Sequence, residues 1–175
     1  MSYLKLCLSG KMQYYCPETL LVMSSSGGFF RTERHPTRKA ITGLLGAAFG
    51  YERGDKHLDD FRESLDMKYR TVKSGNVIVD FNTVAPLYDD VYFKNVEGGF
   101  MKGNTGRVIK KIEYLTNYEF EVYIGGDKEK LKEIYDHIVR PYWPLYIGKK
   151  VCLPAKPIVE EFEILDQLPA DVYDI

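Results

Sequence analysis

Residues 35–55 read HPTRKAITGLLGAAFGYERGD, and this segment limits the fold more strongly than any other. About ten consecutive residues are small or apolar, and Pro36 suits a first helical turn, where no backbone N–H is needed. Gly50 is placed to end the helix, so we predict a helix over residues 36–49. Glycine costs a helix about 1 kcal/mol relative to alanine. Gly43 and Gly46 therefore predict close packing of this helix on a sheet.

Strand and helix patterns follow one another around this helix. Residues 3–9 and 117–126 alternate apolar and polar side chains and predict strands. Residues 67–84 predict a hairpin around Lys-Ser-Gly-Asn, and the Ser24–Gly28 stretch predicts a loop. A second helix follows Asp127, with Leu131, Ile134, Tyr135 and Ile138 on one face, and residues 156–165 supply a last strand.

This order of elements is typical of an α+β protein with a ferredoxin-like, RRM-type split βαβ core. We predict one domain over residues 1–175. The polar segment after Val84 is too long for a tight hairpin and predicts an insertion.

Charge is distributed unevenly along the chain. The formal net charge is −1, but residues 157–175 hold six acids and neither Lys nor Arg, which leaves 24 bases against 19 acids (+5) before this short acidic tail. No apolar run reaches the ~20 residues that span a bilayer, and the N-terminal apolar stretch is too short for a signal peptide. We expect a soluble, cytoplasmic protein. The three cysteines lack CxxC spacing, so we expect no metal and no cofactor.

Three basic clusters are candidate anion sites. The first, Arg31 to Lys39, lies at the start of the first helix, where free N–H groups favour phosphate; the alternative is a solvated basic patch. The second lies in and after the insertion and suits a finger that follows a nucleic-acid backbone, or a polar surface hairpin. The third places Lys149 and Lys150 near Trp143 and Tyr146, which suits base stacking, although both aromatic residues could be core and we favour core for Trp143.

Catalysis has little support in the sequence. The three histidines are far apart, and neither GxSxG nor HExxH occurs. A metal-independent ribonuclease could use Tyr, Lys and His as acid and base, but no pattern brings such residues together.

Several segments match a known family in order: LKLCLSGKMQYY, FRTERHPTRKAITGLLGAAFGYERGD, DFNTV, EYLTNYEFEVYI and YWPLYIGKKVCLPAKP. They resemble the Cas5 family, in particular the subunit of the type I-E CRISPR surveillance complex, Cascade. The match covers most of residues 2–158. Its most specific parts are the Pro-Thr-Arg helix and the Tyr-x-Gly-Lys-Lys-x-Cys segment.

The resemblance implies a ferredoxin-like core with a thumb-like β-hairpin at residues 84–111. It implies a subunit that caps the 5′ handle of the CRISPR RNA, contacts the backbone and large subunits, and meets target DNA only through the complex, with no membrane partner. The side chains that we then expect at the RNA are Gln13, Tyr14, Arg31, Thr32, Arg34, Thr37, Arg38, Lys39, Lys102, Arg107, Lys110, Lys111, Tyr146, Gly148, Lys149 and Lys150.

The chain departs from the family pattern in three places. The usual Gln-x-Trp-Gly is Gln13-Tyr14-Tyr15-Cys16 here, so a tyrosine would have to replace the stacking tryptophan. The tail after Leu165 is shorter than in many relatives. Type I-C relatives process precursor RNA with a Tyr-Lys-His set, but residues 110–113 lack histidine, and the Lys56-His57 pair lies elsewhere. The resemblance implies a non-catalytic subunit; a metal-independent endoribonuclease, or an interaction domain without RNA, are the alternatives.

Overall fold

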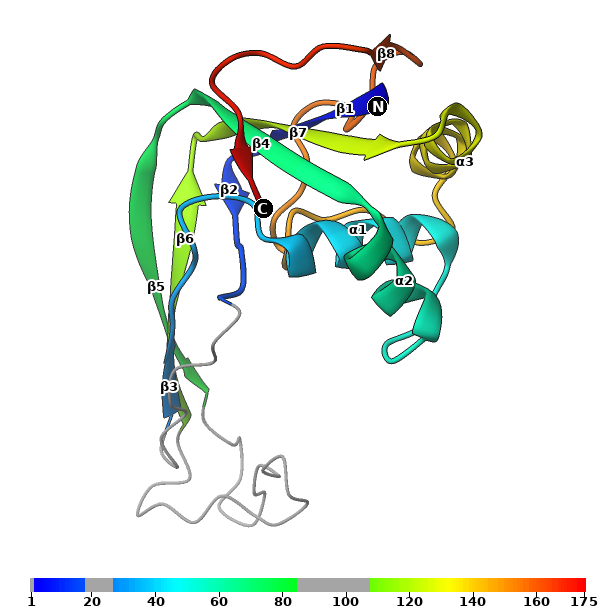
Figure 1. Ribbon diagram of the computed structural model, residues 1–175. Helices are drawn as coiled ribbons and strands as arrows, with labels where there is room; N and C mark the ends of the chain where they lie inside the picture. The colour runs from blue at the N-terminus through cyan, green and yellow to red at the C-terminus, as the bar shows by residue number, and fades with distance from the viewer. Residues whose placement is uncertain (1, 18–26, 85–107) are drawn as a thin grey trace.

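The computed structural model describes residues 2–17, 27–84 and 108–175. The described chain is a mixed α+β fold with two sheets, and the helices lie against one of them (Figure 1). Among these residues, no helix is both long and apolar enough to cross a membrane.

The larger sheet is antiparallel and forms the body of the protein. Its order is β8 (Ile164–Leu165), β1 (Ser2–Ser9), β7 (Glu119–Gly126), β4 (Asp66–Lys73) and β9 (Tyr173–Asp174). β1 pairs with β7 along its whole length, which places Leu4, Leu6 and Leu8 opposite Ile124, Val122 and Phe120. All six side chains are buried, as their alternation predicts. The order β8-β1-β7-β4 is compatible with a split βαβ core.

Helix α1 (Arg38–Phe49) confirms the predicted first helix within two residues. Thr37 is its N-cap, so Pro36 precedes the cap instead of occupying the first turn. Gly50 ends the helix in the left-handed conformation (φ 81°), and its N–H donates to the carbonyl of Gly46. The helix buries Ile41, Leu44, Leu45 and Ala48.

Helix α3 (Lys128–Val139) begins after Asp127, whose side chain accepts from the N–H of Lys130, as predicted. It buries Leu131, Ile134 and Ile138, while Tyr135 is half-buried.

Helix α2 (Lys56–Ser64) was not predicted, and it corrects the interpretation of the glycines. A Cβ at Gly46 would collide with Leu58 of α2, so Gly46 permits helix–helix packing and not packing on the sheet. Gly43 is exposed, and a Cβ there would meet nothing within 4 Å. The α2 sequence is mostly charged and buries only Phe61, which hides its period. The start of α2 could have been predicted from Asp55, since aspartate is favoured as an N-cap. Its side chain accepts from the N–H of His57 at 3.0 Å.

The second sheet forms an arm that extends away from the body (Figure 1). It consists of β5 (Asn76–Val84), β6 (Val108–Thr116), β3 (Gly27–Phe30) and β2 (Met12–Gln13). β5 pairs with β6 from end to end, from Asn76 opposite Thr116 to Val84 opposite Val108, and β3 runs parallel to β6.

The predicted 67–84 hairpin is therefore wrong in its pairing, although both strands exist. β4 pairs with β7 and β9, whereas β5 pairs with β6. The chain changes sheets near Gly75, where a Cβ would collide with the carbonyl of Thr116. Gly27 and Gly28, expected in a loop, are strand residues of β3. The predicted thumb joins β5 to β6, and its residues 85–107 lie outside the described chain.

The acidic tail folds back on the body sheet. The strand predicted over residues 156–165 is reduced to the two residues of β8, while the N–H of Cys7 donates to the carbonyl of Ile158 at 2.7 Å. Asp174 pairs with Lys68 and Asp171 with Arg70, so the tail neutralises bases of β4.

Candidate nucleic-acid interface

Two surface grooves collect most of the predicted side chains. The junction groove, of about 630 Å³, lies between α1, the chain after β2 and the 146–148 turn, and is lined by Tyr14, Lys39, Arg53, Tyr146 and Gly148 among others. The tip groove, of about 660 Å³, lies at the start of α1 and is lined by Arg31, Arg34 and Arg38, with Thr32 and Thr37. The sequence clusters at the helix start and at 146–150 thus meet in space at Tyr14, Lys39 and Gly148.

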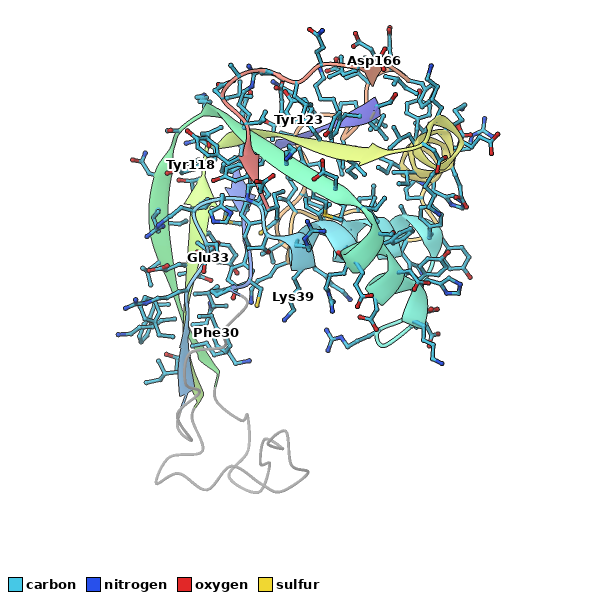
Figure 2. The ribbon with its side chains drawn as sticks, in the orientation of Figure 1. Phe30, Glu33, Lys39, Tyr118, Tyr123 and Asp166 are labelled. Atoms are coloured by element: carbon cyan, nitrogen blue, oxygen red, sulfur yellow. The ribbon has the colours of Figure 1, made fainter. Side chains whose placement is uncertain are left out.

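Lys149 is the cation beside the junction groove with the most aromatic contact. Its Nζ stands 4.3 Å from the ring centroid of Tyr14 and 5.3 Å from that of Phe30. Burial lowers the pKa of its ammonium, and the charge of Lys110 acts in the same direction. Figure 2 labels Phe30 on the arm and Lys39 at the start of α1, the two elements that this region joins.

Gly148 fixes the position of the 148–150 turn. Its φ is +95°, and a Cβ would lie less than 3.0 Å from the carbonyl oxygen of Tyr14. The N–H of Tyr14 donates to the carbonyl of Ile147 at 3.1 Å, so the turn is held against the chain that follows β2. This close approach places Lys149 over the Tyr14 ring.

The Gln13-Tyr14-Tyr15-Cys16 segment lies mostly in the interior. Gln13 is fully buried; its Nε2 donates to the carbonyl of Tyr118 at 2.6 Å, and its Oε1 accepts from the Tyr15 hydroxyl at 2.5 Å. Tyr15 packs edge-on against Phe120 in the core. Burial raises the pKa of Tyr14 to about 12, so its hydroxyl stays protonated. Of the two tyrosines, Tyr14 is the one that lines a groove.

The tip groove has a mixed charge. Arg31 and Arg34 are exposed, and the Arg31 guanidinium lies 5.3 Å from the centroid of the Phe29 ring. Glu33 and Glu113 line the same groove, and Glu113 accepts from the N–H of Thr32 at 3.3 Å. Glu113 comes from β6, which is far from the arginines along the chain, so no local pattern predicts that it lies beside them.

Besides Gln13, three more residues predicted at the RNA are engaged inside the protein. Thr37 is the buried N-cap of α1, and the Thr32 hydroxyl accepts from the N–H of Tyr15 at 2.9 Å. Arg38 donates to the carbonyls of Arg62 (2.8 Å) and Leu65 (2.9 Å) and to the main-chain oxygen of Ile175 (3.2 Å). Arg38 therefore joins α1 to the end of α2 and to the tail.

The remaining candidates lie on the arm and the turn. Lys110 and Lys111 are exposed on opposite faces of β6, and Lys111 lies 5.8 Å from the centroid of the Phe81 ring. Lys150 is exposed. Lys102 and Arg107 lie outside the described residues. Trp143, favoured as core, is 38% exposed.

The described residues contain no cluster of His, Cys, Asp or Glu that could hold a metal. The histidines stack on three different rings: His35 on Tyr69, His57 on Tyr51 and His137 on Phe49. His57 also contacts Asp55 at 2.7 Å.

Sequence reasoning missed one residue in the junction groove and one beside it. Phe30 contributes a ring beneath Lys149, and Arg53 lines the junction groove. The adjacency of Phe29-Phe30 to Arg31 was a usable pattern for the first, since aromatic residues beside bases are typical of nucleic-acid surfaces. Arg53 lies after Gly50, which ends α1, and no aromatic residue directly beside it pointed to a role in binding.

Comparison with known proteins decides the family. The family model described as "CRISPR-associated protein (Cas_Cas5)" matches residues 3–173. The chain belongs to the Cas5 family. That the subtype is I-E stays a prediction, and comparison with curated protein sequences gives no match.

Solved structures agree with this Cas5 assignment. A chain of a structure described as "CRISPR RNA-guided surveillance complex" has a TM-score of 0.75 and 27% identity over 90% of this chain. This Cas5 chain spans 61% of that protein's length. A second structure, described as "Crystal structure of Cas protein", shares the fold (TM-score 0.65, 21% identity, 96% of this chain and 67% of the other).

Proposed function

We propose that this Cas5 chain is a non-catalytic RNA-binding subunit of a type I-E CRISPR surveillance complex, built on a ferredoxin-like core, that holds the 5′ handle of the CRISPR RNA. The observation that carries the proposal is the junction groove. Lys39 and Arg53 line this groove, and beside it Lys149 lies over the rings of Tyr14 and Phe30.

This combination suits a single-stranded nucleic acid. Cations neutralise phosphates, and aromatic surfaces beside them receive unstacked bases. Because the Lys149 ammonium is partly desolvated, a phosphate that replaces its remaining water would interact with it more strongly than with a fully exposed lysine. The tip groove adds Arg31 and Arg34 near the base of the arm.

The remaining parts of the proposal follow from the family. The backbone and large subunits of the complex would be the protein partners, target DNA would be met through the complex, and the site of action would be the cytoplasm. No cofactor is required for binding, and a separate ribonuclease would cleave the precursor RNA.

Binding of a labelled handle RNA to the full chain is expected to weaken steeply with salt. About four phosphate contacts would give a slope of roughly −3 for log K against log salt concentration. Fluorescence anisotropy between about 50 and about 200 mM salt measures this slope. A scrambled RNA of the same length is the control, and a salt-independent or undetectable interaction would refute RNA binding.

The same reaction in EDTA separates the enzymatic alternative. We expect the RNA to be recovered at full length on a denaturing gel. Specific cleavage in EDTA that is lost when Lys56 and His57 are both replaced by alanine would instead support an endoribonuclease that uses His57 next to Asp55 and Tyr51.

A further inference from the structure

No contact within the described chain requires glycine at position 43. It lies in the middle of α1, where glycine is less favourable than alanine. Gly46 makes room for Leu58, and Gly50 caps the helix, but Gly43 is exposed and a Cβ there would meet nothing within 4 Å. Because glycine has no side chain, another molecule can approach the helix backbone closely at this position.

Grooves lie on both sides of this flat position. Gly43 and Ala47 line the junction groove and also a third groove of about 330 Å³, which we call the helix groove. The helix groove reaches Leu58 and Arg62 of α2 and the Trp143 side chain. Lys39 and Arg53 also line both grooves, so the two depressions meet across α1 between these two cations.

The helix groove has its own means of holding a polyanion. Arg62 and Arg53 are exposed on its wall, and within the described part of the chain the Arg62 guanidinium pairs only with the exposed Asp59, at 3.1 Å. The backbone N–H of Trp143 donates to the carbonyl of Ala47 at 3.1 Å, which fixes the position of this residue, and the residue is 38% exposed. An exposed indole between cations provides a stacking surface for a base.

Thr42 adds an independent observation. It lines the helix groove and is 2% exposed, and its hydroxyl has no hydrogen-bond partner within the part of the chain that the structure describes. Buried hydroxyls are normally satisfied. Because the oxygen itself is covered, a hydrogen-bonding ligand in the groove would become its partner only after the Thr42 side chain turns toward the groove.

We propose that single-stranded RNA bound in the junction groove crosses α1 at Gly43 and continues into the helix groove. Arg53 and Arg62 contact its phosphates there, and Trp143 stacks on a base. This inference rests on the proposed RNA-binding function. Continuity with the junction groove and the exposed tryptophan favour RNA over an acidic peptide, because a peptide carries no bases to stack.

A steric variant with a matched control tests the crossing. Gly43→Leu places a bulky side chain on the exposed helix surface, whereas Gly43→Ala adds only a methyl group; both are expected to fold. The full-length chain is titrated with labelled oligouridylates of about 8 and about 16 nucleotides. Wild type should bind the longer RNA more tightly, and Gly43→Leu should lose about tenfold of that affinity while Gly43→Ala stays within about twofold.

Charge and stacking variants test the far side of the crossing. Of the two grooves, Arg62 and Trp143 line only the helix groove, so Arg62→Ala and Trp143→Ala should each weaken binding of the longer RNA several-fold and leave that of the shorter one nearly unchanged. A Lys5→Ala/Lys128→Ala variant, which removes two exposed lysines outside the grooves, is the charge control.

The outcomes separate this inference from the proposed function. If wild type binds both RNAs but these variants bind like wild type, the crossing is wrong and junction-groove binding stands. If wild type binds neither oligouridylate but binds the handle RNA, the crossing is wrong; if it binds none of the three RNAs, the proposed function itself fails. If the variants bind RNA normally but no longer join the other subunits of the complex, the helix groove holds protein and the inference is overturned.

Discussion

Replacing Gly148 with alanine is expected to destabilise the protein by about 2–6 kcal/mol and to remove RNA binding at the junction groove. The backbone at this position is left-handed (φ +95°), which disfavours any residue with a side chain. The added Cβ would also collide with the carbonyl oxygen of Tyr14. Relief requires the turn to move away from Tyr14, and Lys149 would then leave its position over the two rings.

Gly54 provides a matched control for this effect. Its φ is +90°, almost the same as that of Gly148, but a Cβ there would meet nothing within 4 Å. Gly54→Ala should therefore cost only the backbone strain, about 1 kcal/mol. Urea unfolding of both variants gives the two free energies of unfolding. Equal losses would show that the contact with Tyr14 contributes nothing beyond backbone conformation.

Neighbouring cations at the start of α1 are expected to have opposite roles. Arg38→Ala should lower the free energy of unfolding by about 2–4 kcal/mol, because its half-buried guanidinium donates to three main-chain oxygens on α2, the residue after it and the tail. Lys39→Ala should leave stability within about 0.5 kcal/mol, because Lys39 is exposed. It should weaken RNA binding and reduce the salt slope by about 1.

Urea unfolding and anisotropy on the same two proteins test this division. An Arg38→Lys variant keeps the charge but cannot reach several carbonyls at once, so it should lose stability nearly as Arg38→Ala does. If Arg38→Ala folds as stably as wild type and loses RNA binding alone, Arg38 is a direct RNA contact and the structural role is wrong. A Lys39→Ala variant with unchanged affinity would remove Lys39 from the interface.

The body of the fold could be predicted from periodicity and capping. Alternation of buried residues identified β1 and β7, and Asp127 and Gly50 marked helix ends because capping is a local interaction. Strand pairing could not be predicted in the same way. Residues 67–84 contain two strands around a turn-like sequence, yet the chain changes sheets there, because alternation does not specify which neighbour a strand pairs with.

The sequence predicted which residues gather near the candidate interface better than it predicted which of them face solvent. Tyr14, Lys39, Tyr146 and Gly148 do line one groove, although 132 positions separate Tyr146 from Tyr14 in the sequence. Gln13, Thr32 and Thr37 are buried and hydrogen-bonded within the protein, a distinction that depends on tertiary burial. The cluster of bases in the sequence also overstated the positive charge of the tip groove, since Glu113 of β6 lines it together with the arginines.

Photo-crosslinking tests the central claim most directly. A handle RNA with 4-thiouridine at single positions is assembled with the full chain and its complex, irradiated, and the crosslinked peptides are identified by mass spectrometry. We predict crosslinks at Tyr14 and Phe30, which contact Lys149, at Tyr146 in the junction groove, and at Phe29 beside Arg31. Crosslinks confined to α3 or to the acidic tail, with none at these aromatic residues, would contradict RNA binding at the junction between arm and body.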